Sequence, residues 1–286
     1  MSRARYLKII PWLFFVGGVS ACGPKGFSTQ GRQYLPADLG ESKVTDPGED
    51  GSADENGELG TPEVTGSGLI KPTVYYFPVI NEDQKTCNSK VPLLGPKGEV
   101  LAQVCQSSLS SCSLQGACAL IQNNTTRSFN INGRVLGRDR FFETTNTQCK
   151  FGFGVKKSCL DPFYTLAADL TIYQPGDVIY IPRVAGLRLP NGSKHNGYFI
   201  IRDTGRAIKG HGRFDFFSGY YGWKNSENPF IKLGLGSKST QLPFYKISGP
   251  TAKFILASRG FPLLPGAQPG AGAGAADSDT TFALRP

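Results

Sequence analysis

The chain has 286 residues, a length that allows one or two domains. It carries 31 lysine and arginine residues against 22 aspartate and glutamate residues, and this net charge of +9 favours an anionic partner. Beyond the first 21 residues no stretch approaches 18 consecutive apolar residues, which excludes a protein with several membrane-spanning helices and predicts a soluble body.

The N-terminus is typical of an export signal. Three basic residues within the first eight precede a mostly apolar run over residues 9–19, about half the length that a bilayer span needs. The run ends in Val-Ser-Ala-Cys-Gly, which resembles a bacterial lipobox, whose cysteine becomes the new N-terminus and carries acyl chains. We predict a signal peptide over residues 1–21 and a lipid on Cys22, with an ordinary signal peptide as the alternative. The residue after the cysteine does not resemble an inner-membrane retention signal, so we expect an outer-membrane anchor facing the periplasm.

An acidic segment follows the predicted lipid. Residues 23–66 hold nine acidic and three basic side chains, with many Gly, Ser, Thr and Pro residues and almost no aromatic ones. Such a segment cannot bury enough apolar surface to offset its ordering entropy, which predicts a disordered tether over residues 22–67. The rest of the chain is therefore strongly basic. Peptidoglycan carboxylates, anionic polymers and lipid headgroups are the candidate partners, while the export signal argues against nucleic acid; charge that serves solubility alone is the alternative.

Six cysteines besides the predicted lipid attachment site all lie before residue 160. An even number in an exported protein predicts disulfides, with fifteen possible pairings. Zinc sites usually contain a C-x₂₋₄-C pair, and the spacings here are wider, so we predict no metal and no cofactor. The cysteines are Cys87, Cys105, Cys112, Cys118, Cys149 and Cys159.

The second half of the chain predicts short β-strands and little helix. Runs rich in Val, Ile and aromatic residues are separated by Pro-Gly and Pro-Asn-Gly turns. One helix is predicted over residues 251–259, and the Pro-, Gly- and Ala-rich residues 261–286 predict a disordered tail. The folded body is therefore expected over residues 68–260, as a small β-barrel. The predicted strands cover residues 164–173, 178–182, 197–203 and 213–217.

The most specific motif is Asp-Thr-Gly-Arg-Ala-Ile-Lys-Gly at residues 203–210, followed by Phe-Asp-Phe at residues 214–216. An earlier Ala-Ala-Asp at residues 167–169 precedes a Pro-Gly turn and a strand. Together these blocks resemble the three-aspartate (3D) domain of the membrane-bound lytic transglycosylase A family and related cell-wall proteins, over roughly residues 160–235. The resemblance implies a double-psi β-barrel. It also implies cleavage of the MurNAc–GlcNAc bond of peptidoglycan glycan strands to a 1,6-anhydro product.

The resemblance implies a role for each aspartate. Asp215 matches the catalytic acid, whereas Asp203 and Asp169 match the two aspartates that shape the site and its electrostatics. The loop between Asp203 and Asp215 matches the segment that brings the backbone close to the sugar. Its expected substrate-binding residues are Thr204, Gly205, Arg206, Lys209 and Gly210.

The residue chemistry is consistent with this role. Cleavage of a glycosidic bond needs a carboxylic acid that is still protonated near neutral pH, and burial or a second carboxylate raises the pKa of an aspartate. If Phe214 and Phe216 face one side of a strand, Asp215 faces the other. A hydrolase needs a second working carboxylate. A lytic transglycosylase needs only one, because the 6-hydroxyl of the muramoyl sugar is the nucleophile.

Two departures from the family pattern keep other functions open. Arg206 stands where the family usually has glycine, and the sequence shows no clear counterpart of the family's second domain, so the cysteine-rich residues 68–160 would have to serve instead. A non-catalytic peptidoglycan-binding protein, with structural aspartates, is one alternative. An aspartic protease is another, although only one Asp-Thr-Gly occurs and such enzymes need two. For Tyr220, Tyr221 and Trp223 we predict core packing, with a sugar-stacking platform as the alternative.

Overall fold

A computed structural model describes residues 62–144 and 149–266 of the chain. These residues are mainly β, as predicted. They contain helices α1 (Gln106–Gln115), α2 (Pro229–Lys232) and α3 (Gly249–Ser258). None of the helices in these ranges has the length and apolar character needed to cross a membrane. The predicted signal peptide, Cys22 and most of the predicted tether and tail lie outside the described residues.

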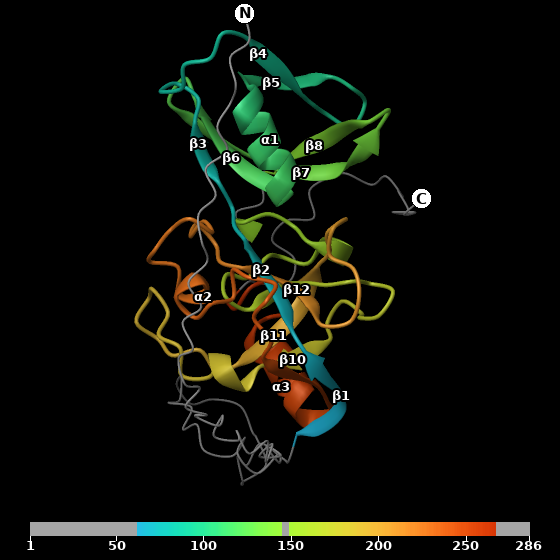
Figure 1. The fold of residues 1–286 in the computed structure, drawn as a ribbon. Helices are drawn as coiled ribbons and strands as arrows, with labels where there is room; N and C mark the ends of the chain where they lie inside the picture. Colours follow the sequence, from blue (N-terminus) through green and yellow to red (C-terminus); the bar gives the residue numbers. More distant parts are fainter. Residues whose placement is uncertain (1–61, 145–148, 267–286) are drawn as a thin grey trace, which may run out of the picture. The chain divides into compact units, whose positions relative to one another are not determined.

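The largest of the three sheets in the described residues has seven strands and carries the 3D motif. Four neighbouring strands, β11, β9, β12 and β2, contribute the residues discussed below, and β2 lies beside β12 although about 140 residues separate them (Figure 1). One face packs on a cluster of apolar side chains that includes Phe199, Phe214, Phe216 and Phe244. In sheet order the strands are β1 (Glu63–Leu69), β13 (Pro243–Ser248), β10 (Val178–Tyr180), β11 (Tyr198–Asp203), β9 (Thr165–Ala167), β12 (Arg213–Phe217) and β2 (Lys71–Tyr75).

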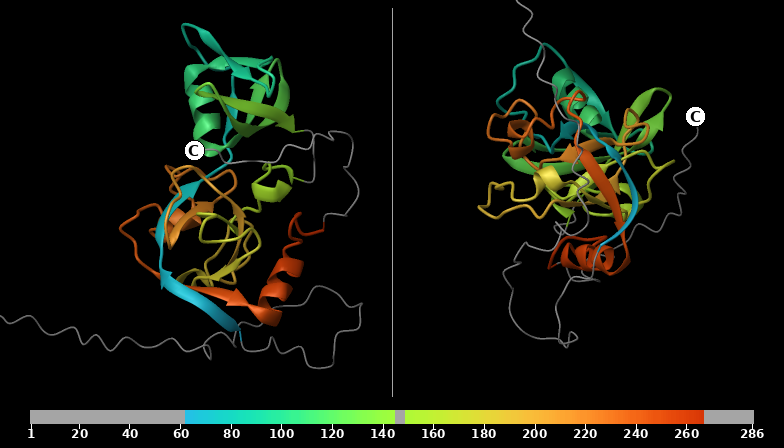
Figure 2. Two further views of the ribbon diagram at one scale, coloured as in Figure 1. Left: turned by 90° about the vertical axis from the view of Figure 1, so that its right-hand side faces the viewer. Right: turned by 60° about the horizontal axis from the view of Figure 1, so that its bottom comes forward.

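One extended segment supplies both edges of this sheet. β1 pairs with β13, the chain bends at Ile70, and β2 then pairs with β12. Figure 2 shows the two strands as one bent ribbon in blue. No pairing among the described strands joins β1 to β2, so the hydrogen-bonded sheet is open between its edges.

A second sheet and a hairpin occupy the cysteine-rich half. Helix α1 packs with them on a separate apolar cluster that includes Leu93, Val104, Phe129 and Phe141. This half therefore has a core of its own, which the sequence did not predict. The sheet contains β3 (Val79–Asn81), β6 (Ala117–Gln122), β7 (Thr125–Val135) and β8 (Arg138–Thr144), and the hairpin contains β4 (Lys90–Leu94) and β5 (Val100–Cys105).

The predicted elements agree with the structure except in the segment predicted as a strand over residues 164–173, of which only Thr165–Ala167 is a strand, and at the ends of the body. Strands over residues 178–180, 198–203 and 213–217 and helix α3 are confirmed. Residues 171–173, predicted as strand, form a turn instead. The folded part begins at Glu63 and not at residue 68, because β1 pairs with β13 over six residue pairs despite its poor apolar content. The tether, predicted to extend to residue 67, therefore ends before Glu63.

The predicted disulfides are confirmed, and all three pairings are local. They join Cys87 to Cys105, Cys112 to Cys118 and Cys149 to Cys159, with sequence separations of 18, 6 and 10 residues. The six thiols are therefore consumed by covalent bonds and none is a metal ligand.

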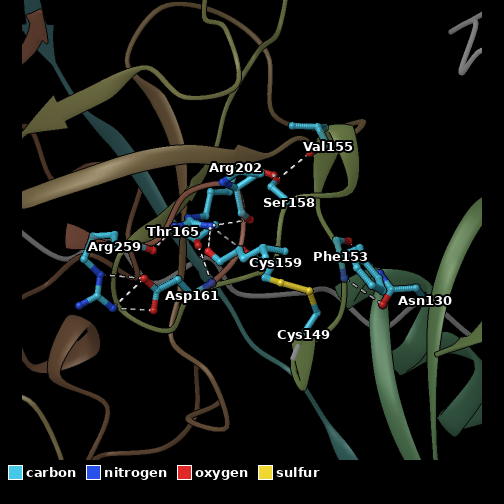
Figure 3. The surroundings of a disulfide bond; sticks show 12 residues. Asn130, Cys149, Phe153, Val155, Ser158, Cys159, Asp161, Thr165, Arg202 and Arg259 are labelled. Atoms are coloured by element: carbon cyan, nitrogen blue, oxygen red, sulfur yellow. Dashed lines mark hydrogen bonds and ion pairs between the residues drawn. A yellow bond between two sulfur atoms is a disulfide. The ribbon is translucent and has the colours of Figure 1, made fainter. Parts of the chain in front are cut away.

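A buried arginine holds the C-terminal segment against the large sheet. Arg202 is fully buried, and its guanidinium donates hydrogen bonds to four backbone carbonyls (Figure 3). Three of these carbonyls belong to residues 259–263, so the first residues of the predicted tail are part of the fold. Arg259 also pairs with buried Asp161 at 2.7 Å. Burial lowers the pKa of Arg202 to about 10, which leaves it charged at neutral pH.

Replacing this arginine has a large expected effect on stability. We expect Arg202→Met to lower the free energy of unfolding by about 4 kcal/mol, because one buried and three partly buried carbonyls lose their donor and Asp161 loses a nearby cation. Urea unfolding of the chain without its signal peptide measures the loss. The matched variant Arg188→Met, at an exposed position, should change it by no more than about 0.5 kcal/mol. A loss below about 1 kcal/mol in Arg202→Met would contradict the assignment.

Candidate active site

Two of the three motif aspartates lie in one row across the large sheet. Asp203 on β11 and Asp215 on β12 both pair with Ala167 on the strand between them, and Asp215 pairs in turn with Thr73 on β2. Paired residues of adjacent strands point to the same face, and adjacent strands lie about 4.8 Å apart. The two aspartate Cα atoms are therefore about 10 Å apart. Ala167, which lies between them, has only a methyl group as its side chain and so leaves space between the two carboxyl groups.

An irregularity in β11 places Asp203 on this face. Ile201 pairs with Leu166 and Asp203 with the next residue of β9, so Arg202 is an extra residue in the ladder. In a regular strand Asp203 would face the same way as Ile201, which is buried in the apolar core. The bulge turns the carboxylate to the opposite face, a common device next to active sites.

Two residues of β2 hold the carboxylates in place. The Tyr75 hydroxyl donates to Asp203 Oδ2 at 2.9 Å, and the Thr73 hydroxyl donates to Asp215 Oδ1 at 2.6 Å. Arg213 Nη2 donates to Thr73 Oγ1 at 2.9 Å, which orients that hydroxyl towards Asp215. Sequence reasoning missed both β2 residues. Their only signal is that they lie two positions apart and thus share a face.

The two carboxylates differ in their free oxygens. Asp203 accepts from the Thr204 amide on Oδ1 and from Tyr75 on Oδ2. Among the described residues no hydrogen-bond donor reaches Oδ2 of Asp215. Asp215 therefore has one oxygen available for a ligand, whereas both oxygens of Asp203 are occupied.

The environment favours protonation of both carboxyls. Burial raises the pKa of Asp203 to about 7, with the Asp215 charge adding to the effect and the bonds from Thr204 and Tyr75 opposing it. Burial also raises the pKa of Asp215, opposed by the Thr73 hydrogen bond and by the charges of Arg213 and Lys238. Phe214 and Phe216 lie on the face of β12 opposite to Asp215, as predicted, and there they pack in the apolar core. A carboxyl that keeps its proton near neutral pH can act as a general acid.

The third aspartate anchors the motif loop. Asp169 Oδ2 accepts from the Gly210 amide at 2.9 Å, and Oδ1 accepts from the amide and hydroxyl of Thr171. These bonds, led by that of Gly210, lower the pKa of Asp169 to about 2. Asp169 is thus an ionised residue that shapes the loop and forms no hydrogen bond to the other two aspartates.

The predicted substrate-binding residues divide into backbone supports and exposed cations. Thr204 donates its hydroxyl to the Ala168 carbonyl, and Gly205 packs closely on Ile208. Lys209 and Arg206 have side chains exposed by 60% and 62%. Lys209 Nζ lies 3.7 Å from Asp169 Oδ1, so the Asp169 carboxylate partly neutralises the charge of Lys209. Arg206, the departure from the family pattern, lies 3.2 Å from Asp139 on β8.

Comparison with known proteins agrees with the motif. Residues 164–226 match the 3D domain family. The resemblance inferred from the three aspartate blocks is thereby confirmed for the segment that carries the site. No sequence among curated proteins matches the chain.

Several solved structures that resemble the chain are those of lytic transglycosylases. MltA of E. coli with bound chitohexaose is 15% identical, with 63% of this chain and 72% of that chain covered and a TM-score of 0.44. The membrane-bound lytic murein transglycosylase of Agrobacterium tumefaciens is 14% identical, with 66% and 75% covered and a TM-score of 0.42. MltA of Neisseria gonorrhoeae is 13% identical, with 63% and 72% covered and a TM-score of 0.39.

Proposed function

We propose that the protein is a peptidoglycan lytic transglycosylase that cleaves the MurNAc–GlcNAc bond and leaves a 1,6-anhydro end. The observation that carries the proposal is the geometry of Asp215. It has a raised pKa, one oxygen fixed by Thr73 and the other oxygen open. Asp203, which lies across Ala167, completes the acidic pair of the 3D domain.

One carboxyl performs both proton transfers. Protonated Asp215 donates to the glycosidic oxygen as the bond to the muramoyl anomeric carbon breaks, and the GlcNAc residue leaves with a free 4-hydroxyl. The resulting carboxylate then takes the proton of the muramoyl 6-hydroxyl. The 6-oxygen bonds to the anomeric carbon, which closes the anhydro ring and returns Asp215 to its protonated state. No water enters the products.

The partner carboxylate argues against two other reactions. A hydrolase needs a second carboxylate free to activate water or to attack the sugar. Asp203 has both oxygens engaged by Thr204 and Tyr75, which favours the transglycosylase. An aspartic protease needs two carboxylates that share a proton, and among the described residues no hydrogen bond joins Asp203 to Asp215. Asp203 is instead a supporting residue, held by Thr204 and Tyr75 and uncharged below pH about 7.

The proposal includes the predicted location and architecture. We propose a lipid on Cys22 that anchors the protein in the outer membrane with its body in the periplasm, where glycan strands lie. We also propose that the seven strands of the large sheet form a double-psi β-barrel. The bend at Ile70, by which one segment supplies both edges, supports that arrangement.

Product analysis tests the function. Purified sacculi are incubated with the chain lacking residues 1–21, with disulfides intact, and the soluble fraction is examined by mass spectrometry. We expect muropeptides with 1,6-anhydro-muramic ends, 18 mass units lighter than the hydrated products, which differ by one water. Hydrated reducing ends would establish a hydrolase instead. Protein that pellets with sacculi and releases nothing would establish the non-catalytic binder.

A further inference from the structure

The loop after β12 exposes two large aromatic side chains. Tyr220 and Trp223 are 53% and 52% exposed, whereas their neighbour Tyr221 packs against the core of the large sheet. Core packing is therefore the correct prediction for Tyr221 and wrong for the other two. Tyrosine and tryptophan combine a large apolar ring with a polar group, which is why they are enriched at binding surfaces. We call Tyr220, Trp223 and the adjacent Lys224 the aromatic platform.

Buried polar residues hold the loop in a fixed conformation. The Ser218 hydroxyl is fully buried and lies within hydrogen-bond distance of the carbonyl oxygens of Tyr75 and Tyr221, at 3.0 and 2.6 Å. Asn228, also fully buried, donates its side-chain amide to the Tyr221 carbonyl at 2.8 Å. The backbone that carries both rings is thus ordered before a ligand arrives, which lowers the entropy cost of binding.

Packed rings connect the platform to the acidic pair. Tyr220 contacts Phe151 with ring centroids 4.8 Å apart, and Phe151 contacts Phe217 at 5.8 Å. Phe217 contacts Tyr75 at 5.0 Å, the residue whose hydroxyl bonds Asp203. Tyr220 is also five residues after Asp215, so their Cα atoms lie within about 18 Å. A row of packed, buried rings therefore joins the loop that carries the platform to the strands that carry the acidic pair.

The chemistry of the platform fits a muramoyl-containing glycan. One face of a pyranose ring presents C–H groups that pack on aromatic rings, and muramic acid adds a carboxylate on its lactyl group or peptide stem. The Lys224 ammonium lies 4.8 Å from the centroid of the Trp223 ring and forms no ion pair with any described residue. A sugar on the rings would therefore bring its carboxylate close to an available cation.

We propose that the aromatic platform is a saccharide-binding subsite, in which Tyr220 and Trp223 pack on a sugar of the glycan strand and Lys224 pairs with the muramoyl carboxylate. The inference deepens the proposed function and rests on it for the identity of the glycan. It assigns the platform a positioning role, since these residues hold the strand and leave the proton transfers to Asp215. The platform selects strands that carry stems over neutral chitin-type strands.

Trp223 is itself the probe for the test. The chain has two tryptophans, and the other lies at position 12, in the predicted signal peptide. Fluorescence of the chain without residues 1–21 therefore reports on the platform alone. We expect chitohexaose and stem-bearing peptidoglycan fragments each to produce a saturable change in Trp223 emission. The Asp215→Asn variant prevents turnover during the titration.

Three variants separate ring packing from charge. Tyr220→Ala should weaken binding of both ligands about tenfold, and Tyr220→Phe, which keeps the ring, should bind as the parent does. Lys224→Gln should weaken binding of the stem-bearing fragments several-fold and leave chitohexaose unchanged. Phe254→Ala, which removes an exposed aromatic ring from α3, is the matched control and should change neither affinity.

The outcomes distinguish this proposal from the proposed function. Release of anhydro-muropeptides by the parent chain without any emission change at saturating ligand would overturn the subsite and leave the catalytic proposal intact. A saturable emission change without product release would support the subsite and overturn catalysis. Equal binding by Tyr220→Ala and the parent would also overturn the subsite, provided that both unfold at the same urea concentration.

Discussion

Asp215→Asn is expected to lower the release of anhydro-muropeptides about a thousandfold. General acid catalysis contributes about 10² to 10⁴ to the rate, and an amide cannot deliver the proton that the glycosidic oxygen needs. The fold should persist, because an amide oxygen can still accept the Thr73 hydrogen bond. The initial rate of product release from sacculi, followed by mass spectrometry, measures the effect.

Two controls make the Asp215 result specific. Asp83→Asn changes an aspartate outside the 3D domain that also accepts backbone hydrogen bonds, and its activity should match the parent. Sedimentation with sacculi should be unchanged in Asp215→Asn, since the aromatic platform is intact. An Asp215→Asn chain with more than a tenth of parent activity would show that another group supplies the proton.

Asp203→Asn is expected to remove a pH dependence of stability. The folded chain holds the Asp203 proton up to pH about 7, whereas the ordinary pKa of an aspartate in the unfolded chain is near 3.8. This contribution is therefore fully present below pH 3.8 and is lost as the pH rises through about 7. A shift of about three units corresponds to about 4 kcal/mol. The asparagine of the variant does not titrate, so the free energy of unfolding of the variant lacks this decline with rising pH.

The measurement is urea unfolding of parent and variant at constant salt between pH 4 and pH 8. The difference between the two free energies of unfolding should change by about 4 kcal/mol over that interval, with the parent losing stability relative to the variant as the pH rises. Asp169→Asn is the control. The pKa of Asp169 is lowered to about 2, so its contribution is present throughout pH 4 to 8 and is lost only in stronger acid, and the difference between this variant and the parent should stay nearly constant over the interval. Parallel curves for parent and Asp203→Asn would contradict the assigned environment.

Several features of the structure could be predicted from short stretches of the sequence or from residue counts. Alternation in Arg213 to Phe217 predicted that Phe214 and Phe216 lie on the face of β12 opposite to Asp215, because successive side chains of a strand point to opposite faces. The even cysteine count predicted disulfides, and the three aspartate blocks predicted a 3D domain that the family match confirms over residues 164–226. Each of these inferences depends on residues within a short window or on a count.

Long-range pairing decided what the short windows could not. Thr73 meets Asp215 across 142 residues because β2 pairs in parallel with β12, and no local pattern specifies that partner. The strand β1 begins at Glu63 in a segment of acidic and small residues, because β13 supplies its hydrogen bonds. Arg202 is likewise buried only because residues 259–263 return to it.

The sequence by itself determined the β character of the body, the presence of disulfides and the three aspartates of the motif. These depend on the chemical nature of the residues and on their spacing along the chain. Only the tertiary structure decided the face of the sheet to which Asp203 points and the pKa of its carboxyl group. It also decided which oxygen of Asp215 is left open and that Tyr220 and Trp223 are exposed. The reason is physical: burial, register and hydrogen bonding at a site are set by segments distant in the chain, and these segments set the free energy of a proton on a carboxylate.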